Sequence, residues 1–207
     1  YGFRKGRSTI DAVLKVVRTA EAERTRTWRT RRLCLLILLD VRNAFNSMPW
    51  DVVMGTLKEA GVSSYLRRVV GDYLKDRSIV AASGEEFIMT AGVPQGSILG
   101  PTLWNVAYNG VLRVEMPEDV ETIAYADDLG IIVKAKDERQ LVVKANEAME
   151  RVARWMEEQQ LELAAEKTEA ILLTGRKKCN PLEGLRLREA EVLVKREVKY
   201  LGVVLDQ

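Results

Sequence analysis

Hydrophobic positions along the chain fall into patterns that predict strands in three places. Residues 33–39 form an unbroken apolar run, and its length favours a buried strand over a helical segment. Residues 120–124 and 129–133 are both rich in β-branched side chains, and they flank the acidic dipeptide Asp127-Asp128. Two such runs around a short polar turn predict a β-hairpin with the carboxylates at its tip.

Apolar residues recur at helical spacing in the segments between these strands. Ser8, with Asp11 three residues later, predicts the start of an amphipathic helix that extends to about residue 23. Further helices are predicted after Pro49, Ser63, Pro101 and Asp137, and shorter strands at 79–82, 87–90, 170–173, 192–194 and 198–205. Because helices and strands alternate irregularly, we expect an α+β fold with a mixed or antiparallel sheet and helices packed on one face.

Composition narrows the class of protein. The chain has 207 residues, of which 47% are hydrophobic, enough for one substantial core and a single domain. It contains no histidine, and its cysteines at 34 and 179 have no metal-binding spacing, which argues against zinc chemistry and histidine catalysis. It has no signal peptide and no apolar stretch long enough to span a membrane, so we expect an intracellular protein without a membrane partner.

Charge is distributed unevenly although the net charge is only +2. Residues 1–32 carry ten Lys or Arg and three Asp or Glu, a local charge of +7, which leaves the remainder of the chain at −5. This polarity is typical of a protein that holds a polyanion beside catalytic cations. A solvated helix face would account for the same charges.

The acidic residues predict a metal site. Neighbouring carboxylates such as Asp127 and Asp128 repel each other, and a divalent cation removes that cost. Successive side chains of an extended chain point to opposite faces, so we assign the primary ligand role to Asp127. Asp40 follows the buried run and needs a partner, for which a cation shared with Asp127 is suitable. The alternatives are that Asp40 caps the next turn and that the dipeptide is a solvated turn.

Several short motifs follow one another along the chain. The strand ending in Asp40 is followed by Ala44-Phe45, then by Pro94-Gln95-Gly96-Ser97, then by Tyr125-Ala126-Asp127-Asp128. The remaining motifs are Tyr1-Gly2-Phe3-Arg4-Lys5-Gly6-Arg7-Ser8-Thr9, Glu166-Lys167-Thr168-Glu169 and Lys199-Tyr200-Leu201-Gly202. Taken in order, these motifs resemble the reverse transcriptases of non-LTR retrotransposons, in particular the insect R1-like group.

The resemblance implies a polymerase palm with partial fingers and no thumb. Within a domain of residues 1–207 it implies a basic finger and palm segment at 1–32, a palm core at 33–175 and a hairpin at 190–205 similar to a primer grip. We expect the chain to be a fragment of a retrotransposon polyprotein that acts, by resemblance only, in the nucleus. The isolated fragment is expected to have little polymerase activity.

The resemblance also implies roles for individual residues. Two Mg²⁺ ions, replaceable by Mn²⁺, would be held by Asp40, Asp127, Asp128 and the carbonyl of Val41. These ions would support transfer of deoxynucleotides to a primer 3′-hydroxyl, since paired cations stabilise the entering and leaving oxygens. Lys167 resembles the lysine that protonates the departing pyrophosphate, although an ordinary surface lysine is an alternative.

Nucleotide and nucleic-acid contacts are implied in the same way. Phe45 would exclude a 2′-hydroxyl, unless it is a core residue, and Gln95 and Gly96 would contact the nucleotide or the template. An RNA template and a DNA primer are expected to bind Arg4, Lys5, Arg7, Tyr200, Leu201 and Gly202. Two other functions remain open: a nucleic-acid-binding palm relic without catalysis, and an RNA-templated RNA polymerase, which Phe45 argues against.

Overall fold

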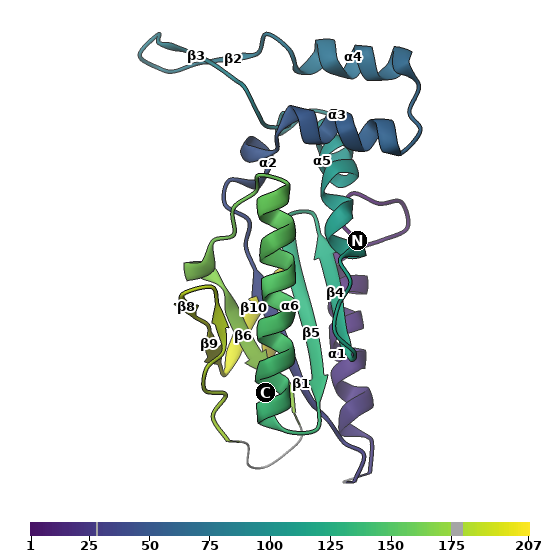
Figure 1. Ribbon diagram of the computed structural model, residues 1–207, viewed down its shortest axis with the longest axis vertical. Coiled ribbons are helices and arrows are strands. Elements are labelled where there is room, and N and C mark those ends of the chain that lie inside the picture. The colour runs from purple at the N-terminus through teal and green to yellow at the C-terminus, as the bar shows by residue number, and fades with distance from the viewer. Residues whose placement is uncertain (28, 175–179) are drawn as a thin grey trace.

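A mixed five-stranded sheet forms the centre of the protein, with strand order β4-β5-β1-β6-β9. The computed structural model describes residues 1–27, 29–174 and 180–207 (Figure 1). All neighbouring strands are antiparallel except β6 and β9, which are parallel. The strands are β1 (Leu33–Leu39), β4 (Val120–Tyr125), β5 (Asp128–Ala135), β6 (Glu169–Leu172) and β9 (Leu193–Lys195). The expected α+β fold with a mixed sheet is confirmed.

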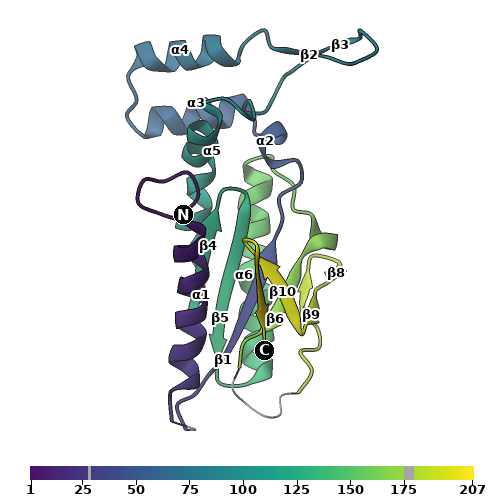
Figure 2. The same ribbon diagram turned by 180° about the vertical axis from the view of Figure 1, so that it is seen from behind.

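Both faces of the sheet are covered. Alternate side chains of β1, beginning with Leu33 and ending with Leu39, share a core cluster with the long helix α6 (Glu138–Glu158). Cys34 and Leu36 point the other way, into a second cluster with α1 (Thr9–Arg24) and the hairpin of β10 (Glu197–Tyr200) and β11 (Val203–Asp206). Figure 2 shows α1 and this hairpin on the face opposite α6. The expectation that the helices pack on one face was therefore wrong, because a strand that is apolar on both sides requires cover on both.

The remaining helices lie beyond one end of the sheet. Helix α5 (Gly100–Tyr108) joins the sheet to α3 (Trp50–Glu59), and α4 (Ser64–Leu74) packs against α3 (Figure 1). The sequence had suggested that both α3 and α4 pack on a face of the sheet. In the structure neither of them does. The other elements are α2 (Ala44–Ser47), β2 (Ser78–Val80), β3 (Glu86–Ile88), η1 (Asn109–Arg113), η2 (Ala165–Lys167), β7 (Arg186–Leu187) and β8 (Ala190–Glu191).

Local signals set the ends of these elements. Ser8 and Asp11 form a reciprocal capping box at the start of α1, as expected. Gly61 has φ +74° just after α3, a conformation that a residue with a Cβ atom adopts at a cost. The predicted strand at 198–205 is instead divided into β10 and β11 by a turn at Leu201 and Gly202, whose φ values are 49° and 84°. Two positive φ angles in succession match the twist of a tight hairpin.

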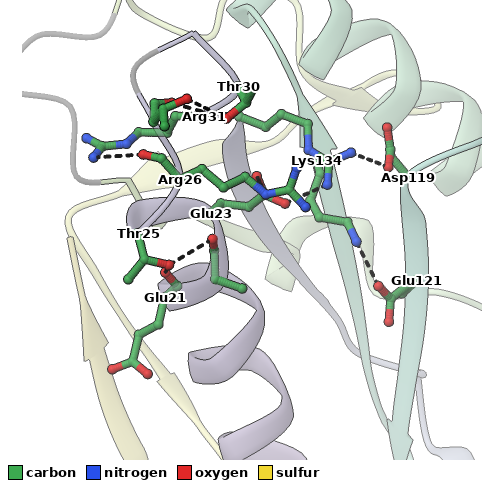
Figure 3. A network of polar contacts seen from close by, with 12 residues as sticks. Glu21, Glu23, Thr25, Arg26, Thr30, Arg31, Asp119, Glu121 and Lys134 are labelled. Carbon is green, nitrogen blue, oxygen red and sulfur yellow. Dashed lines mark hydrogen bonds and ion pairs between the residues drawn. The ribbon is translucent and has the colours of Figure 1, made fainter.

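A network of ion pairs around the buried Glu23 joins α1 to the sheet at the end where β1 begins (Figure 3). Glu23 is 3% exposed, and its Oε1 accepts a hydrogen bond from Arg32 Nη2 at 2.6 Å. Arg32 also pairs with Asp119, which precedes β4. Burial raises the pKa of Glu23, but the hydrogen bond and charge of Arg32 outweigh it and the pKa is lowered overall. This network lies at the opposite end of β1 from Asp40.

In the described part of the chain, no helix combines the length and the apolar character needed to cross a bilayer. Cys34 is a buried free thiol, and Cys179 lies outside the described residues.

Candidate active site

The strand registers bring three of the expected site residues into one row. The pairing of β1 with β5 ends at Leu39 and Leu129, so the next position places Asp40 opposite Asp128. The pairing of β1 with β6 continues in the same way to place Asp40 beside Lys167. Because side chains alternate along a strand, all three lie on the face that carries the β10–β11 hairpin. Lys167 Nζ lies 2.9 Å from Asp40 Oδ2, with the two side chains 65% and 38% exposed.

A cavity of about 230 Å³ opens over this row. Asp40, Asp128 and Lys167 line it together with Tyr200 and Leu201 of the hairpin. Tyr200 is only 2% exposed, and burial and then the charge of Asp128 raise the pKa of its hydroxyl. The ring of Tyr200 therefore packs between the hairpin and the sheet, and Leu201 and Gly202 are left at the tip. The expected contact of Tyr200 with nucleic acid stays a prediction.

Asp127 occupies a tightly held turn. Tyr125 pairs with Asp128, so Ala126 and Asp127 alone connect β4 to β5, and Ala126 has φ 54°. Trp104 Nε1 donates a hydrogen bond to the Ala126 carbonyl oxygen at 3.1 Å. On another side, the Gly2 backbone is so close that an added Cβ atom would lie 2.3 Å from Ala126 N. The turn is thus fixed by residues distant from it in the sequence.

The electrostatics of the row favour a cation. Burial of its carboxyl group, then the charges of Asp127 and Asp40, raise the pKa of Asp128 to about 6. A divalent cation would relieve this repulsion, and carboxylate and carbonyl oxygens suit magnesium. The bridge between Val41 and Leu163 uses the backbone groups of Asp40 and Arg42 and leaves the Val41 carbonyl out. The carboxylate oxygens and the Val41 carbonyl oxygen are therefore suitable ligands for a metal ion.

These ligands do not form a preformed metal site in the described part of the chain. In residues 1–27, 29–174 and 180–207, no three acidic, cysteine or histidine side chains are grouped closely enough to hold an ion by themselves. Asp40 is instead paired with Lys167. A cation would have to share Asp40 with this ammonium or displace it.

Phe45 is a partly buried residue that packs against the core. Its half-buried ring stacks on Trp104, with centroids 5.1 Å apart and an interplanar angle of 21°. The ring of Phe3 meets Phe45 edge-on, with centroids 6.2 Å apart. Phe45 is therefore neither a fully buried core residue nor a free surface ring.

The loop that contains Gln95 and Gly96 is tied to the Phe45 segment. Val93 N donates to the Phe45 carbonyl oxygen at 2.7 Å, and both Gln95 and Gly96 are exposed. Ser97 Oγ donates to the Pro94 carbonyl oxygen at 2.7 Å and accepts from Gly100 N at 2.9 Å. The loop is therefore anchored to the Phe45 backbone and presents Gln95 and Gly96 to solvent.

The basic residues near the start of the chain lie in a loop before α1. Arg4, Lys5 and Arg7 are all exposed. Arg4 donates to Asn109 Oδ1, and the Arg7 guanidinium lies 5.4 Å from the centre of the Tyr1 ring. Asn105 Nδ2 donates to the Gly2 carbonyl oxygen at 2.9 Å, which anchors the same loop beside the Ala126 turn.

The sequence did not reveal the contribution of Trp104. Its side chain is 0% exposed, which by itself indicates no more than a core residue. A buried indole nevertheless requires an acceptor for its N–H group, and that requirement was the available signal. The acceptor proves to be the turn that carries Asp127.

Comparison with known proteins gives this arrangement a family. A family described as "Reverse transcriptase (RNA-dependent DNA polymerase)" matches residues 1–205. The chain belongs to the reverse transcriptase family. The expected resemblance is thereby confirmed.

The relatives of this reverse transcriptase chain include several insect retrotransposon proteins. It is 25% identical to the "Probable RNA-directed DNA polymerase from transposon BS" of Drosophila melanogaster, over 100% of the chain and 23% of the relative. It is also 25% identical to the "Retrovirus-related Pol polyprotein from type-1 retrotransposable element R1" of Bradysia coprophila, over 98% of the chain and 20% of the relative. The chain thus spans less than a quarter of either protein.

Solved structures support the fold alone. The structure of apo telomerase from Candida Tropicalis superposes with a TM-score of 0.67 at 12% identity, over 97% of this chain and 35% of that one. At this low sequence identity the likeness is one of fold and carries no function.

Proposed function

We propose that this chain is the catalytic palm of an RNA-directed DNA polymerase from an R1-like non-LTR retrotransposon. It would add deoxynucleotides to a DNA primer 3′-hydroxyl on an RNA template. Membership of the reverse transcriptase family supports the reaction class. The row of Asp128, Asp40 and Lys167 over one cavity is the observation that carries the assignment to this site.

Magnesium fits the donors of this site, and manganese has the same oxygen preference. Asp40, Asp127, Asp128 and the Val41 carbonyl would hold two ions. Bound there, the ions would supply charge stabilisation for the oxygens that enter and leave phosphorus.

The remaining residues have roles that do not depend on the ions. The Phe45 ring would exclude a 2′-hydroxyl, and the exposed backbone of Gln95 and Gly96 would position the nucleotide. Lys167 Nζ would carry the proton that pyrophosphate takes on departure. Its pairing with Asp40 at 2.9 Å keeps this ammonium at the reaction centre.

Template and primer contacts are proposed on two sides of the cavity. Arg4, Lys5 and Arg7 would bind template phosphates, and the tip residues Leu201 and Gly202 would lie against the primer end. The relatives have much longer chains, so we also propose that residues 1–207 alone extend primers poorly and act within a larger polyprotein. Processive synthesis by the isolated chain would refute the latter point.

The deciding experiment is primer extension on an RNA template with deoxynucleotides and Mg²⁺. It uses the chain extended on both sides to its natural domain ends, with Asp127→Asn as the test and Asp76→Asn as the control. Asp76 has a side chain that is 83% exposed, in the segment between α4 and β2. We expect Asp127→Asn to lower the rate by about a thousandfold, because it removes a carboxylate that would hold the cations which stabilise the entering and leaving oxygens, and Asp76→Asn to leave it within about twofold.

Either of two results would overturn the proposal. One is synthesis that does not depend on Asp127. The other is that the chain, lengthened to its natural domain ends and shown to be folded, binds RNA but adds no nucleotide. That is the behaviour of a palm relic.

A further inference from the structure

The turn that carries Asp127 adopts a backbone conformation that its own sequence does not favour. In a two-residue hairpin loop with φ above zero at the first central position, glycine is the preferred residue. Here that position is Ala126, with φ 54°. A residue with a Cβ atom stays in this region only where the surroundings hold it there.

Trp104 supplies much of that constraint. Its indole N–H donates to the Ala126 carbonyl oxygen at 3.1 Å, and the side chain is 0% exposed. If the turn moved, the fully buried indole N–H group would lose its acceptor, and an unpaired buried donor is costly. Gly2 packs against the amide of the same residue and limits movement in another direction.

The same indole is part of a continuous stack of rings. One neighbour is Phe45, at 5.1 Å and 21°, and the other is Tyr108, at 4.7 Å and 24°. Phe45 is the ring proposed to face the sugar, and Ala126 precedes a proposed metal ligand. Among the ring contacts of the described residues, Trp104 joins these two parts of the site directly.

We propose that Trp104 is a positioning residue that holds the Ala126-Asp127 turn in its catalytic conformation and supports the Phe45 ring from beneath. The inference rests on the proposed function, and it separates two contributions of one side chain. The N–H group fixes the turn and so governs the rate of nucleotide addition. The ring face supports Phe45 and so governs the choice between deoxynucleotides and ribonucleotides.

The first test does not require activity. Hydrogen–deuterium exchange of residues 1–207 is compared for the unaltered chain, Trp104→Phe and Trp50→Phe. Trp50 Nε1 also donates to a backbone carbonyl, that of Gly92, at 2.8 Å, so this control removes the same kind of bond elsewhere. We expect Trp104→Phe to speed exchange about fivefold in peptides covering 122–130, and Trp50→Phe to speed it only near residue 92. Equal exchange at 122–130 in all three proteins would overturn the proposal.

The second test uses single-turnover nucleotide addition by the extended polypeptide. Trp104→Phe keeps a stacking ring, so we expect kcat to fall about tenfold while the KM for deoxynucleotides and the sugar preference stay the same. Trp104→Leu removes the ring and should weaken the sugar preference as well. Trp155→Phe should change neither, because Trp155 lies beyond Tyr108 and meets that ring edge-on.

A rescue variant guards against a purely structural effect. Glycine adopts φ 54° without steric cost, so Ala126→Gly should recover at least half of the rate lost in Trp104→Phe. No recovery in a folded double variant would overturn the proposal. If no polypeptide extends primers, the proposed function fails, and the exchange experiment still decides what Trp104 does.

Discussion

Asp128 carries a pH dependence that can be isolated by substitution. Burial and then the charges of Asp127 and Asp40 raise its pKa from 3.8 in the unfolded chain to about 6 in the folded one. A raised carboxyl pKa stabilises the folded state below pH 4, and this stabilisation is lost as the pH rises to 6. The free energy of unfolding should therefore fall by about 1 kcal/mol across this range, a value reduced because the carboxyl group is only partly buried and solvent screens part of the repulsion.

Urea unfolding of the unaltered chain and Asp128→Asn, from pH 3.5 to 7.5 with a chelator present, checks this expectation. Relative to Asp128→Asn, the unaltered chain should have a higher free energy of unfolding at pH 3.5 than at pH 7.5. Parallel curves would show that Asp128 titrates normally. Added Mg²⁺ should raise the stability of the unaltered chain at neutral pH, because a cation favours the ionised carboxylates.

Phe45 is the second residue whose substitution has a specific outcome. Its half-buried ring has one face on Trp104 and an edge near Phe3, so it is held in place and still accessible. Phe45→Ala in the extended polypeptide should relax the preference for deoxynucleotides by about tenfold or more. Phe45→Tyr keeps the ring and should retain the preference. The measurement is the ratio of kcat/KM for the two sugars, and an unchanged ratio in Phe45→Ala would assign the ring to packing alone.

At the scale of elements, the junction of α1 with the sheet depends on a buried charge. Glu23 is buried and accepts a hydrogen bond from Arg32, which Glu23→Ala would leave to Asp119 alone, so the change should cost about 1.5–3 kcal/mol of unfolding free energy. Glu162→Ala provides the contrast, because its pair with Arg42 has side chains that are 66% and 47% exposed. That change should cost under about 1 kcal/mol. Chemical denaturation measures both, and equal losses would mean that burial does not set the strength of these pairs.

The elements differ in how far the sequence determined them. Strand β1 and the β4–β5 hairpin were predictable because each depends on a local apolar run and its turn. The sheet faces that the helices cover were not predictable in this way. Because β1 is apolar on both sides, its sequence does not distinguish one face from the other. Its lack of polar positions was nevertheless a signal that both faces would be covered.

The site was predictable to a similar extent. The sequence motifs identified Asp40, Asp128 and Lys167, and strand register then places them in one row. The sequence could not show that Trp104 bonds to Ala126, because the two residues lie 22 positions apart on different elements. It also could not show that Tyr200 turns inward, since β10 alternates between faces and either face was open to it.

At the scale of the whole molecule, the uneven charge predicts salt-dependent binding to RNA. Residues 1–32 have a charge of +7, and the affinity for single-stranded RNA should fall steeply with salt. Each phosphate contact contributes a slope of about −0.7 to the plot of log affinity against log salt. Lys5→Ala should lower the slope by about this amount, whereas Lys58→Ala on α3 should not. Fluorescence anisotropy at several salt concentrations measures the slopes, and identical slopes for all three proteins would place the template elsewhere.

The row of side chains at the end of β1 also limits where the protein can accept insertions and deletions. Asp40 reaches its neighbours because it lies one residue beyond the last paired residue of β1, Leu39. One residue inserted after Leu36 would move every later side chain of the strand to the opposite face, and Asp40 would turn from the cavity toward α6. An insertion between β2 and β3 would lengthen only an exposed loop. Catalytic competence in this palm therefore depends on the number of residues in β1 as well as on their chemistry. Insertions and deletions should be tolerated better in the outlying helices and hairpin than in β1.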